Sequence, residues 1–329
     1  MRIGILTFHN AQNYGAVLQA YASVRFLQSL GHQVYVVDYR NRSIESYFNP
    51  FYWERARSKK EGLKYAVKYP FIVWAKIRRS LVFNRFVHQR LPLCSLSEAN
   101  NLDLLLVGSD QLWNKKLTSG VRDAVYFGNA FPKVRKVTWG VSAGNTIPDA
   151  DEIQMLRKNF VAFSIREQCL ADMIPHSILL PDPTLMLDAG EWKRLVRPVN
   201  GNKYVLAYPM AYEEEVVESA RQKAGEMGFD LKVILPIIKL GSSWIQTASP
   251  EEFLSLFYSA EYVVTSAYHG AVFSLLFERP HTFIHHGDPR FDTLLSSGLS
   301  SAAVRAKQFL DGIIPPPSSG GESSSEVAW

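Results

Sequence analysis

A turn near residue 269 combines features that suit acid–base chemistry on a phosphorylated ligand. Ser266, His269 and Gly270 follow the apolar run 261–265, typical of a buried strand, and 269–278 continues as an apolar helical pattern. A glycine lets a ligand approach the backbone closely, and a helix N-terminus favours phosphate. Imidazole changes its charge near neutral pH, so His269 could exchange a proton with the ligand. These residues predict a phosphate-binding turn, although a lone histidine is often structural.

Arg166 occupies the same place after another predicted strand, 161–165. In open α/β sheets ligands bind at the carboxyl ends of the strands, so this position faces the expected cleft. The guanidinium group binds a carboxylate or phosphate through two parallel hydrogen bonds, which suits a planar dianion. The alternative is a surface ion pair with Glu167, but neighbours in sequence do not face each other on a helix.

The loop after the predicted strand 103–107 is rich in groups that bind sugars. Asp110, Gln111 and Asn114 offer a carboxylate and two amides to hydroxyl groups, and the Trp113 indole could stack on a sugar ring. Asp110 could also accept a hydroxyl proton. The sequence therefore predicts an acceptor site here, although a structural turn capped by Asp110 would have the same spacing.

A further polar helix start follows the first predicted strand, 3–8. Residues 14–30 show helical periodicity, with Asn13 as the expected N-cap. Asn13 and Tyr14 are therefore candidates for acceptor binding, because a helix N-terminus could hold an anion or a sugar hydroxyl. An ordinary capped helix without a ligand explains the pattern equally well. The chain contains neither G-x-G-x-x-G nor G-x-x-x-x-G-K-[ST], the usual signals of dinucleotide and Walker-type binding.

Histidines near residue 285 do not predict a metal site. His281 and His285 would share one face of a strand, but a rise of about 3.3 Å per residue separates them by about 13 Å. His286 and Asp288 lie nearby without forming H-E-x-x-H or another zinc-binding spacing. We therefore expect neither a metal nor another cofactor.

Strand-like apolar runs alternate with helical patterns along the chain, which predicts parallel sheets flanked by helices. The expected fold class is α/β with two Rossmann-like domains and a turn-rich boundary at 197–202. We place an N-terminal domain at 1–198, with a basic helical insertion at about 41–92. A C-terminal domain at 199–314 and a flexible tail at 315–329 complete the chain.

Positive charge is concentrated in the insertion. The chain has a net charge of +5, but 52–90 alone contains 11 Lys/Arg and two Glu. Trp53, Tyr65, Phe71 and Trp74 are interleaved with these cations. This pattern favours contact with an anionic membrane surface, and solvated faces of ordinary helices are the alternative.

Other features of the sequence indicate the compartment. No run of 18 apolar residues and no export signal is visible. Cys94 and Cys169 lie far apart, which does not suit a disulfide framework. We therefore expect a cytoplasmic protein, working at the inner face of the membrane, with no nucleic-acid partner.

Five segments in order resemble the polysaccharide pyruvyl transferase family, over residues 1 to about 310. They are IGILTFHN at 3–10 with NYGAVLQA at 13–20, VGSDQLWN at 107–114, SIRE at 164–167, DPTL at 182–185 and TSAYHG at 265–270. The resemblance implies two Rossmann-like domains that face a cleft, as in GT-B glycosyltransferases. It also implies phosphoenolpyruvate as the donor and a sugar diol, carried on a lipid-linked oligosaccharide, as the acceptor. The product would be a cyclic ketal in capsule, exopolysaccharide or cell-wall polysaccharide synthesis.

The same resemblance implies roles for the candidate residues. His269 would be the acid–base group, Arg166 would bind the donor anion, and Asp110 would bind a hydroxyl or orient a partner. Many relatives carry Arg two residues before the motif histidine, where this chain has Ala267. Arg290 is our candidate to replace that arginine at the donor phosphate.

Two other functions remain open on this architecture. A nucleotide-sugar glycosyltransferase would release a nucleotide in place of inorganic phosphate. A non-catalytic sugar-binding protein would not need His269, Arg166 and Asp110 in one cleft.

Overall fold

The computed structural model describes residues 1–51, 59–144, 146–210, 213–236, 244–284 and 301–314, and the single residues 238 and 294. The first unit is built on a parallel sheet with strand order β3-β2-β1-β4-β5. Its strands are β1 (Arg2–Leu6), β2 (Gln33–Val37), β3 (Leu93–Cys94), β4 (Leu104–Val107) and β5 (Lys136–Thr138). Isolated bridges join 137 to 162 and 141 to 165, which extends the sheet toward the pair β6 (Ser164–Ile165) and β7 (Ile178–Leu179). β4 is buried along its whole length, as expected of a central strand in a parallel sheet.

The second unit is a smaller parallel sheet with strand order β11-β10-β8-β9. Its strands are β8 (Tyr204–Tyr208), β9 (Asp230–Val233), β10 (Tyr262–Thr265) and β11 (His281–Phe283). The helices of this unit are α8 (Glu214–Met227), α9 (Pro250–Tyr258) and α10 (Tyr268–Leu276). The predicted α/β fold with two Rossmann-like units is therefore confirmed. The expected boundary at 197–202 falls between α7 (Ala189–Lys193) and β8.

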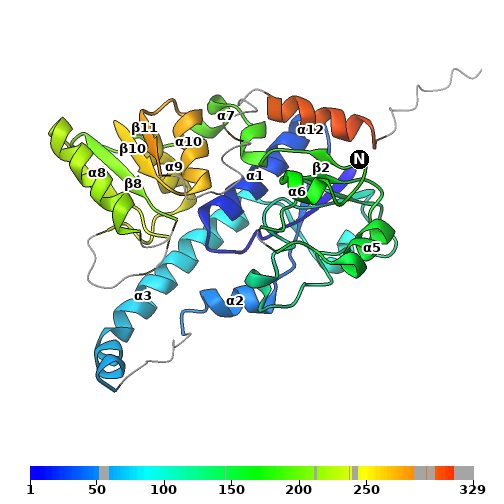
Figure 1. The fold of residues 1–329 in the computed structure, drawn as a ribbon, viewed down its shortest axis with the longest axis horizontal. Helices are drawn as coiled ribbons and strands as arrows, with labels where there is room; N and C mark the ends of the chain where they lie inside the picture. Colours follow the sequence, from blue (N-terminus) through cyan, green and yellow to red (C-terminus); the bar gives the residue numbers. More distant parts are fainter. Residues whose placement is uncertain are drawn as a thin grey trace, which may run out of the picture.

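Helix α1 (Tyr14–Ser29) lies between the two units (Figure 1). Asn13 caps it, because its side-chain oxygen accepts the Ala16 backbone N–H. Tyr14 is fully buried, stacks on Phe253 of α9 with ring centroids 4.3 Å apart, and donates its hydroxyl to the Ala248 carbonyl at 3.0 Å. The helix therefore belongs to the core of both units.

Shorter elements complete the first unit. They are α4 (Leu96–Ala99), α5 (Ala150–Asn159), α6 (Gln168–Ala171) and the 3₁₀ turns η1 (Lys115–Thr118) and η2 (Pro183–Met186). η2 follows β7, begins after its N-cap Asp182 and packs against α1.

The insertion is helical within the described residues, as predicted. It contains α2 (Arg42–Phe48) and the long α3 (Lys59–Arg90), whose N-terminal end projects away from both units (Figure 1). Arg79 anchors α3 to the body of the protein, because its buried guanidinium donates to the Gln12 carbonyl at 2.9 Å and to the Gln246 carbonyl at 2.6 Å. Gln12 belongs to the first unit and Gln246 to the second, so one side chain of the insertion holds both.

The last described helix, α12 (Ser301–Asp311), differs from the predicted domain division. From the sequence this segment is expected in the C-terminal domain, but α12 packs on the first unit (Figure 1). Phe309 lies against Trp139 with centroids 6.4 Å apart, and Arg135 donates to the Ile313 carbonyl at 2.8 Å. Burial of the apolar face of α12 explains the crossing. The predicted tail at 315–329 lies outside the described residues.

Candidate functional site

A cavity of about 700 Å³ lies where the carboxyl ends of the two sheets face each other. The first unit contributes the start of α1, the loop after β4 and helix α2. The second unit contributes the end of β8 and the start of α10. Residues that line the cavity include Asn13, Tyr47, Asp110, Gln111, Lys116, Tyr208, Ala267 and His269. The expected arrangement of two Rossmann-like domains facing a cleft is thus present.

His269 lies in the first turn of α10, and its side chain is 14% exposed. Its Nε2 atom lies 3.3 Å from Oδ2 of Asp182, which belongs to the first unit. The imidazole also lies directly against Gly15 in the first turn of α1, where an added Cβ would come within 2.1 Å of Nδ1. Two residues of the first unit therefore fix the ring of a histidine carried by the second.

Asp182 is the site residue that the sequence analysis missed, although it belongs to the DPTL segment. Its carboxylate is fully buried, and Oδ1 accepts hydrogen bonds from the backbone N–H and the hydroxyl of Thr184, at 2.9 and 2.7 Å. Oδ2 is left to face Arg166 and His269. Burial alone would raise the pKa of Asp182, but the charges of Arg166 and then His269 outweigh it and hold that pKa well below its usual range. The carboxylate therefore stays ionised beside the imidazole.

Arg166 lies beneath the cavity, and it is not among the residues that line it. Its side chain is buried, Nη2 lies 2.5 Å from Oδ2 of Asp182, and Nε donates to Ser109 Oγ at 3.0 Å. The expectation that its fork faces the cleft is thus corrected, because the guanidinium is engaged by a buried carboxylate. The alternative of a surface pair with Glu167 is also wrong, since Glu167 is buried and accepts the Ser142 hydroxyl.

Asp110 and Gln111 line the cavity as predicted. The backbone of Asp110 has φ of +78°, a left-handed conformation that is uncommon outside glycine and recurs at functional sites. Its carbonyl accepts the Ser142 N–H at 2.9 Å, which fixes the loop against the neighbouring strand. One carboxylate oxygen accepts the Gln111 N–H at 2.8 Å, and Gln111 Oε1 accepts the Asn114 amide at 2.6 Å.

Three of the predicted acceptor residues serve the core instead. Tyr14 is buried between the units, as described above. Trp113 is also fully buried, and its indole N–H donates to the Tyr126 carbonyl at 3.1 Å, so it cannot stack on a sugar in the cavity. Asn114 is buried and caps η1 through the Lys116 N–H at 3.1 Å. Burial of aromatic surface explains Tyr14 and Trp113, and the capping hydrogen bond explains Asn114. Asn13 is different: it caps α1 and lines the cavity.

An exposed aromatic side chain that the sequence analysis did not select lines the cavity in place of Trp113. Tyr47 of α2 is 63% exposed and lies on the cavity wall. No sequence pattern marks Tyr47 as a cavity residue, because only the fold of the insertion brings α2 to the cavity.

The residues of the predicted donor turn make hydrogen bonds and packing contacts within the protein. Ser266 donates its hydroxyl to the Glu213 carboxylate and accepts the Met210 N–H at 3.0 Å, so it ties β10 to neighbouring loops. A Cβ at Gly270 would lie 2.2 Å from Thr265 Oγ1, which means that glycine allows α10 to pack closely on β10. Neither residue is among those that line the cavity, and the phosphate-binding roles of Ser266 and Gly270 stay predictions. Ala267, which lines the cavity, is the N-cap of α10 and supplies no side-chain cap.

The remaining candidates from the sequence are Arg290 and the histidines. Arg290, His285, His286 and Asp288 lie outside the described residues. His281 stacks on Phe283 with centroids 4.1 Å apart. Across the residues that the structure describes, no group of three or more His, Cys, Asp or Glu could hold a metal ion.

The family model described as polysaccharide pyruvyl transferase matches residues 13–288. No curated protein matches the chain. Similar solved structures include S. aureus MnaA with UDP, with 12% identity, a TM-score of 0.44, and coverage of 94% of this chain and 88% of that chain.

Two further solved structures are similar at the same level. A putative UDP-N-acetylglucosamine 2-epimerase from Listeria monocytogenes has 10% identity and a TM-score of 0.48, covering 94% of this chain and 88% of that chain. The Streptomyces sp. SF2575 glycosyltransferase SsfS6, complexed with thymidine diphosphate, has 12% identity and a TM-score of 0.40, covering 94% of each chain. At 10–12% identity, the similarity concerns the fold and not the substrate.

Proposed function

Because the chain belongs to the polysaccharide pyruvyl transferase family, we propose that it transfers pyruvate from phosphoenolpyruvate to a sugar diol, forming a cyclic ketal. The observation that supports this proposal most directly is the position of His269, held in the interdomain cavity between Gly15 and the buried carboxylate of Asp182. A histidine fixed by a carboxylate is the arrangement expected of a general acid and base.

The reaction needs proton transfers without a change of oxidation state. Protonation of the donor methylene carbon develops positive charge on its C2 atom, and an acceptor hydroxyl attacks there and loses its proton. The carbon–oxygen bond to phosphate breaks, and the second hydroxyl adds at C2 and gives up its proton to close the ring. Inorganic phosphate leaves, and the carboxylate stays on the product. His269 is the group we assign to proton transfer, and Asp110 is the carboxylate we assign to an acceptor hydroxyl.

Asp182 and Arg166 support His269 from below. An ionised carboxylate next to the imidazole fixes the ring orientation. Arg166 compensates the buried charge of Asp182, because an unpaired carboxylate at this depth would be strongly destabilising. We therefore propose that Arg166 acts through Asp182, in place of the direct donor contact expected from sequence.

The donor anions need other partners, and the cavity offers two. Helix α10 starts at the cavity without a side-chain cap, and its positive end suits a phosphate or carboxylate. Lys116 lines the same cavity from the loop of the first unit. We propose that the donor lies between these groups, within reach of His269.

A turnover assay tests the proposal and separates it from the two alternatives. The full chain is incubated with phosphoenolpyruvate and model or lipid-linked glycosides, and inorganic phosphate and the mass of the glycoside are measured. We expect phosphate release matched by the mass gain of a pyruvate ketal, with neither signal in His269→Ala. Release of a nucleotide from a nucleotide sugar would instead identify a glycosyltransferase. Glycoside binding without turnover of either donor would identify a sugar-binding protein.

A further inference from the structure

The solvent-facing side of α3 carries a row of large apolar side chains. Phe71, Trp74, Ile77 and Leu81 are 68, 60, 37 and 63% exposed, and we call them the apolar stripe. Their spacing of three or four residues places them on one side of the helix. The opposite side packs into the protein through residues such as Ile72, Arg79 and Phe83. Single exposed apolar residues are common on protein surfaces, but four in a row on a projecting helix indicate an interaction site.

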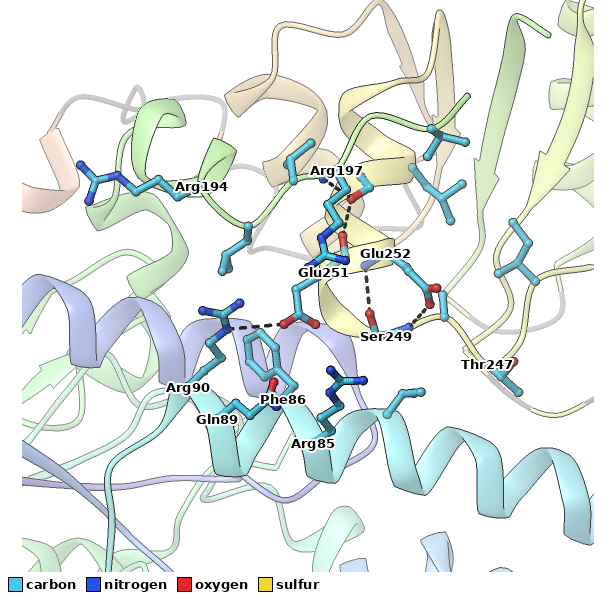
Figure 2. Close-up of a pocket in the computed structure, with 18 of the residues that line it drawn as sticks. Arg85, Phe86, Gln89, Arg90, Arg194, Arg197, Thr247, Ser249, Glu251 and Glu252 are labelled. Carbon is cyan, nitrogen blue, oxygen red and sulfur yellow. Dashed lines mark hydrogen bonds and ion pairs between the residues drawn. The ribbon is translucent and has the colours of Figure 1, made fainter. Parts of the chain in front are cut away.

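Arginines border this stripe along one edge. Arg78 and Arg85 follow the same helical face and also line a cavity of about 790 Å³ between α3 and α9 (Figure 2). Arg90 and Arg197 lie in the same close-up, and Arg90 pairs with Glu251 at 3.5 Å. Among the described residues, the guanidinium groups of Arg85 and Arg197 have no hydrogen-bond or ion-pair partner. In the border itself Arg78 and Arg85 are exposed, so it presents positive charge to solvent at the edge of a cavity that Glu251 and Glu252 also line.

The composition of α3 identifies a partner of opposite charge. The helix contains nine Lys/Arg and one Glu. An apolar stripe with Trp and Phe beside a cationic border is the pattern of a helix that lies in the interface of an anionic bilayer. A second copy of this chain would bring two such cationic helices together, which electrostatic repulsion opposes. Over the described residues, no helix has the length and apolarity to cross a membrane, so α3 would lie on the surface.

We propose that α3 docks the protein on an anionic lipid bilayer, with the apolar stripe entering the headgroup boundary and Arg78 and Arg85 contacting lipid phosphates. This docking is independent of the proposed reaction, because none of these side chains lines the cavity that holds His269. It would place the protein where a lipid-linked acceptor is presented.

Vesicle co-sedimentation with the full chain tests the docking. Vesicles of phosphatidylcholine with phosphatidylglycerol are compared with pure phosphatidylcholine, at low and moderate salt. We expect binding to the anionic vesicles that weakens with salt, since surface charge is screened. Absence of binding at low salt, or equal binding to both vesicle types, would overturn the proposal.

Matched variants locate the contact. We expect at least a tenfold weaker partition for variants of the stripe and for variants of its cationic border, because both apolar burial and charge contribute. The stripe variant is Phe71→Ser/Trp74→Ser/Leu81→Ser and its control, from exposed apolar sites elsewhere, is Val121→Ser/Val161→Ser/Val304→Ser. The border variant is Arg78→Gln/Arg85→Gln and its control is Arg157→Gln/Arg221→Gln. Controls that lose as much binding as the stripe and border variants would refute this location.

Trp74 supplies an independent readout. Vesicles that contain brominated phosphatidylcholine should quench its fluorescence on binding, and Trp74→Phe should keep the binding while losing that part of the quenching. Sedimentation velocity of the parent protein and the stripe variant tests whether the stripe is instead a contact between two copies of the chain. If the parent protein is a dimer and the stripe variant a monomer, the stripe is a self-association surface and the membrane proposal is wrong.

Discussion

At the scale of residues, the candidate site depends on one carboxylate that serves two partners. One carboxylate oxygen of Asp182 accepts hydrogen bonds from Thr184, and the other faces Arg166 and His269. Gly15 provides the space that the imidazole occupies. The position of His269 is therefore set by Gly15 and Asp182 of the other unit. Substitutions at these two positions should change activity, although neither side chain is assigned a contact with substrate.

Gly15→Ala should separate activity from stability. The added Cβ would meet the imidazole at 2.1 Å, so His269 must move. Because a displacement of about 1 Å can cost about 100-fold in rate, we expect a large loss of ketal formation. The free energy of unfolding should change by about 1 kcal/mol or less, since alanine is the better helix former.

Gly225→Ala is the matched control for Gly15→Ala. Gly225 lies in α8 with open space where its Cβ would be. We expect unchanged kcat/KM and a gain of up to about 1 kcal/mol in unfolding free energy. Full activity in Gly15→Ala, or equal losses in both variants, would show that contact with Gly15 does not position His269.

Asp182→Asn should change how stability depends on pH. A carboxylate whose pKa is lowered in the folded state stabilises the fold above its unfolded pKa of about 3.9, and this contribution is lost as pH falls. At pH 7 the variant leaves Arg166 without its charge partner, which should cost about 3–5 kcal/mol. Urea unfolding of both proteins between pH 7 and pH 3.5 measures the difference, which should begin to shrink below about pH 4. A pH-independent difference would contradict the assignment of an ionised Asp182.

At the scale of elements, the capping of a helix N-terminus determines whether its backbone N–H groups are available to bind an anion. α1 is capped by Asn13, whereas α10 begins at Ala267 with no side-chain cap and opens onto the cavity. α3 is held to the body by Arg79, which reaches carbonyl groups on both units and lies over the rings of Tyr14 and Phe83. The insertion is thus a structural part of the interface as well as a surface feature.

Arg79→Met should destabilise the protein by about 2–4 kcal/mol. The methionine fills part of the space but removes the guanidinium that donates to the half-buried carbonyls of Gln12 and Gln246. Arg78→Met is the control, because the neighbouring side chain is exposed and its loss should lie within about 0.5 kcal/mol. Urea unfolding measures both, and equal small effects would show that Arg79 does not join the two units.

At the scale of the whole molecule, one hydrophobic cluster spans the two units, and each unit also has a cluster of its own. A single cluster of buried residues contains Ile3, Leu106 and Trp139 of the first unit together with Leu206 and Phe253 of the second. α12 adds Phe309 to the same cluster after the chain has passed through the second unit. The division into 1–198 and 199–314 therefore separates the two sheets, but buried side chains from both ranges pack together in this cluster.

Shared packing predicts one cooperative unfolding transition. Strands and helices of both units contribute to the cluster that spans them, so unfolding of either unit exposes apolar surface of the other. Far-UV circular dichroism and tryptophan fluorescence during urea unfolding should give coincident curves. Two separated transitions would show that each unit folds independently.

Local sequence patterns determined the fold class and the general place of the site. Apolar runs and helical periodicity identify parallel α/β units, because burial on both faces of a strand leaves a continuous apolar signature. The rule that ligands bind at the carboxyl ends of strands correctly places Asp110, Gln111, Asn13 and His269 on one cavity. The insertion could likewise be identified as helical and basic from its composition.

Only the tertiary structure decided which polar and aromatic residues face that cavity. Trp113 and Tyr14 carry the same sequence signals as a sugar-binding surface, but packing against Tyr126 and Phe253 buries them. Asp182 was not selected, because its role depends on His269, 87 residues away in sequence, lying 3.3 Å from its carboxylate. Periodicity reports which side of an element is buried, whereas a contact between two units depends on how they dock, and no local pattern encodes that geometry.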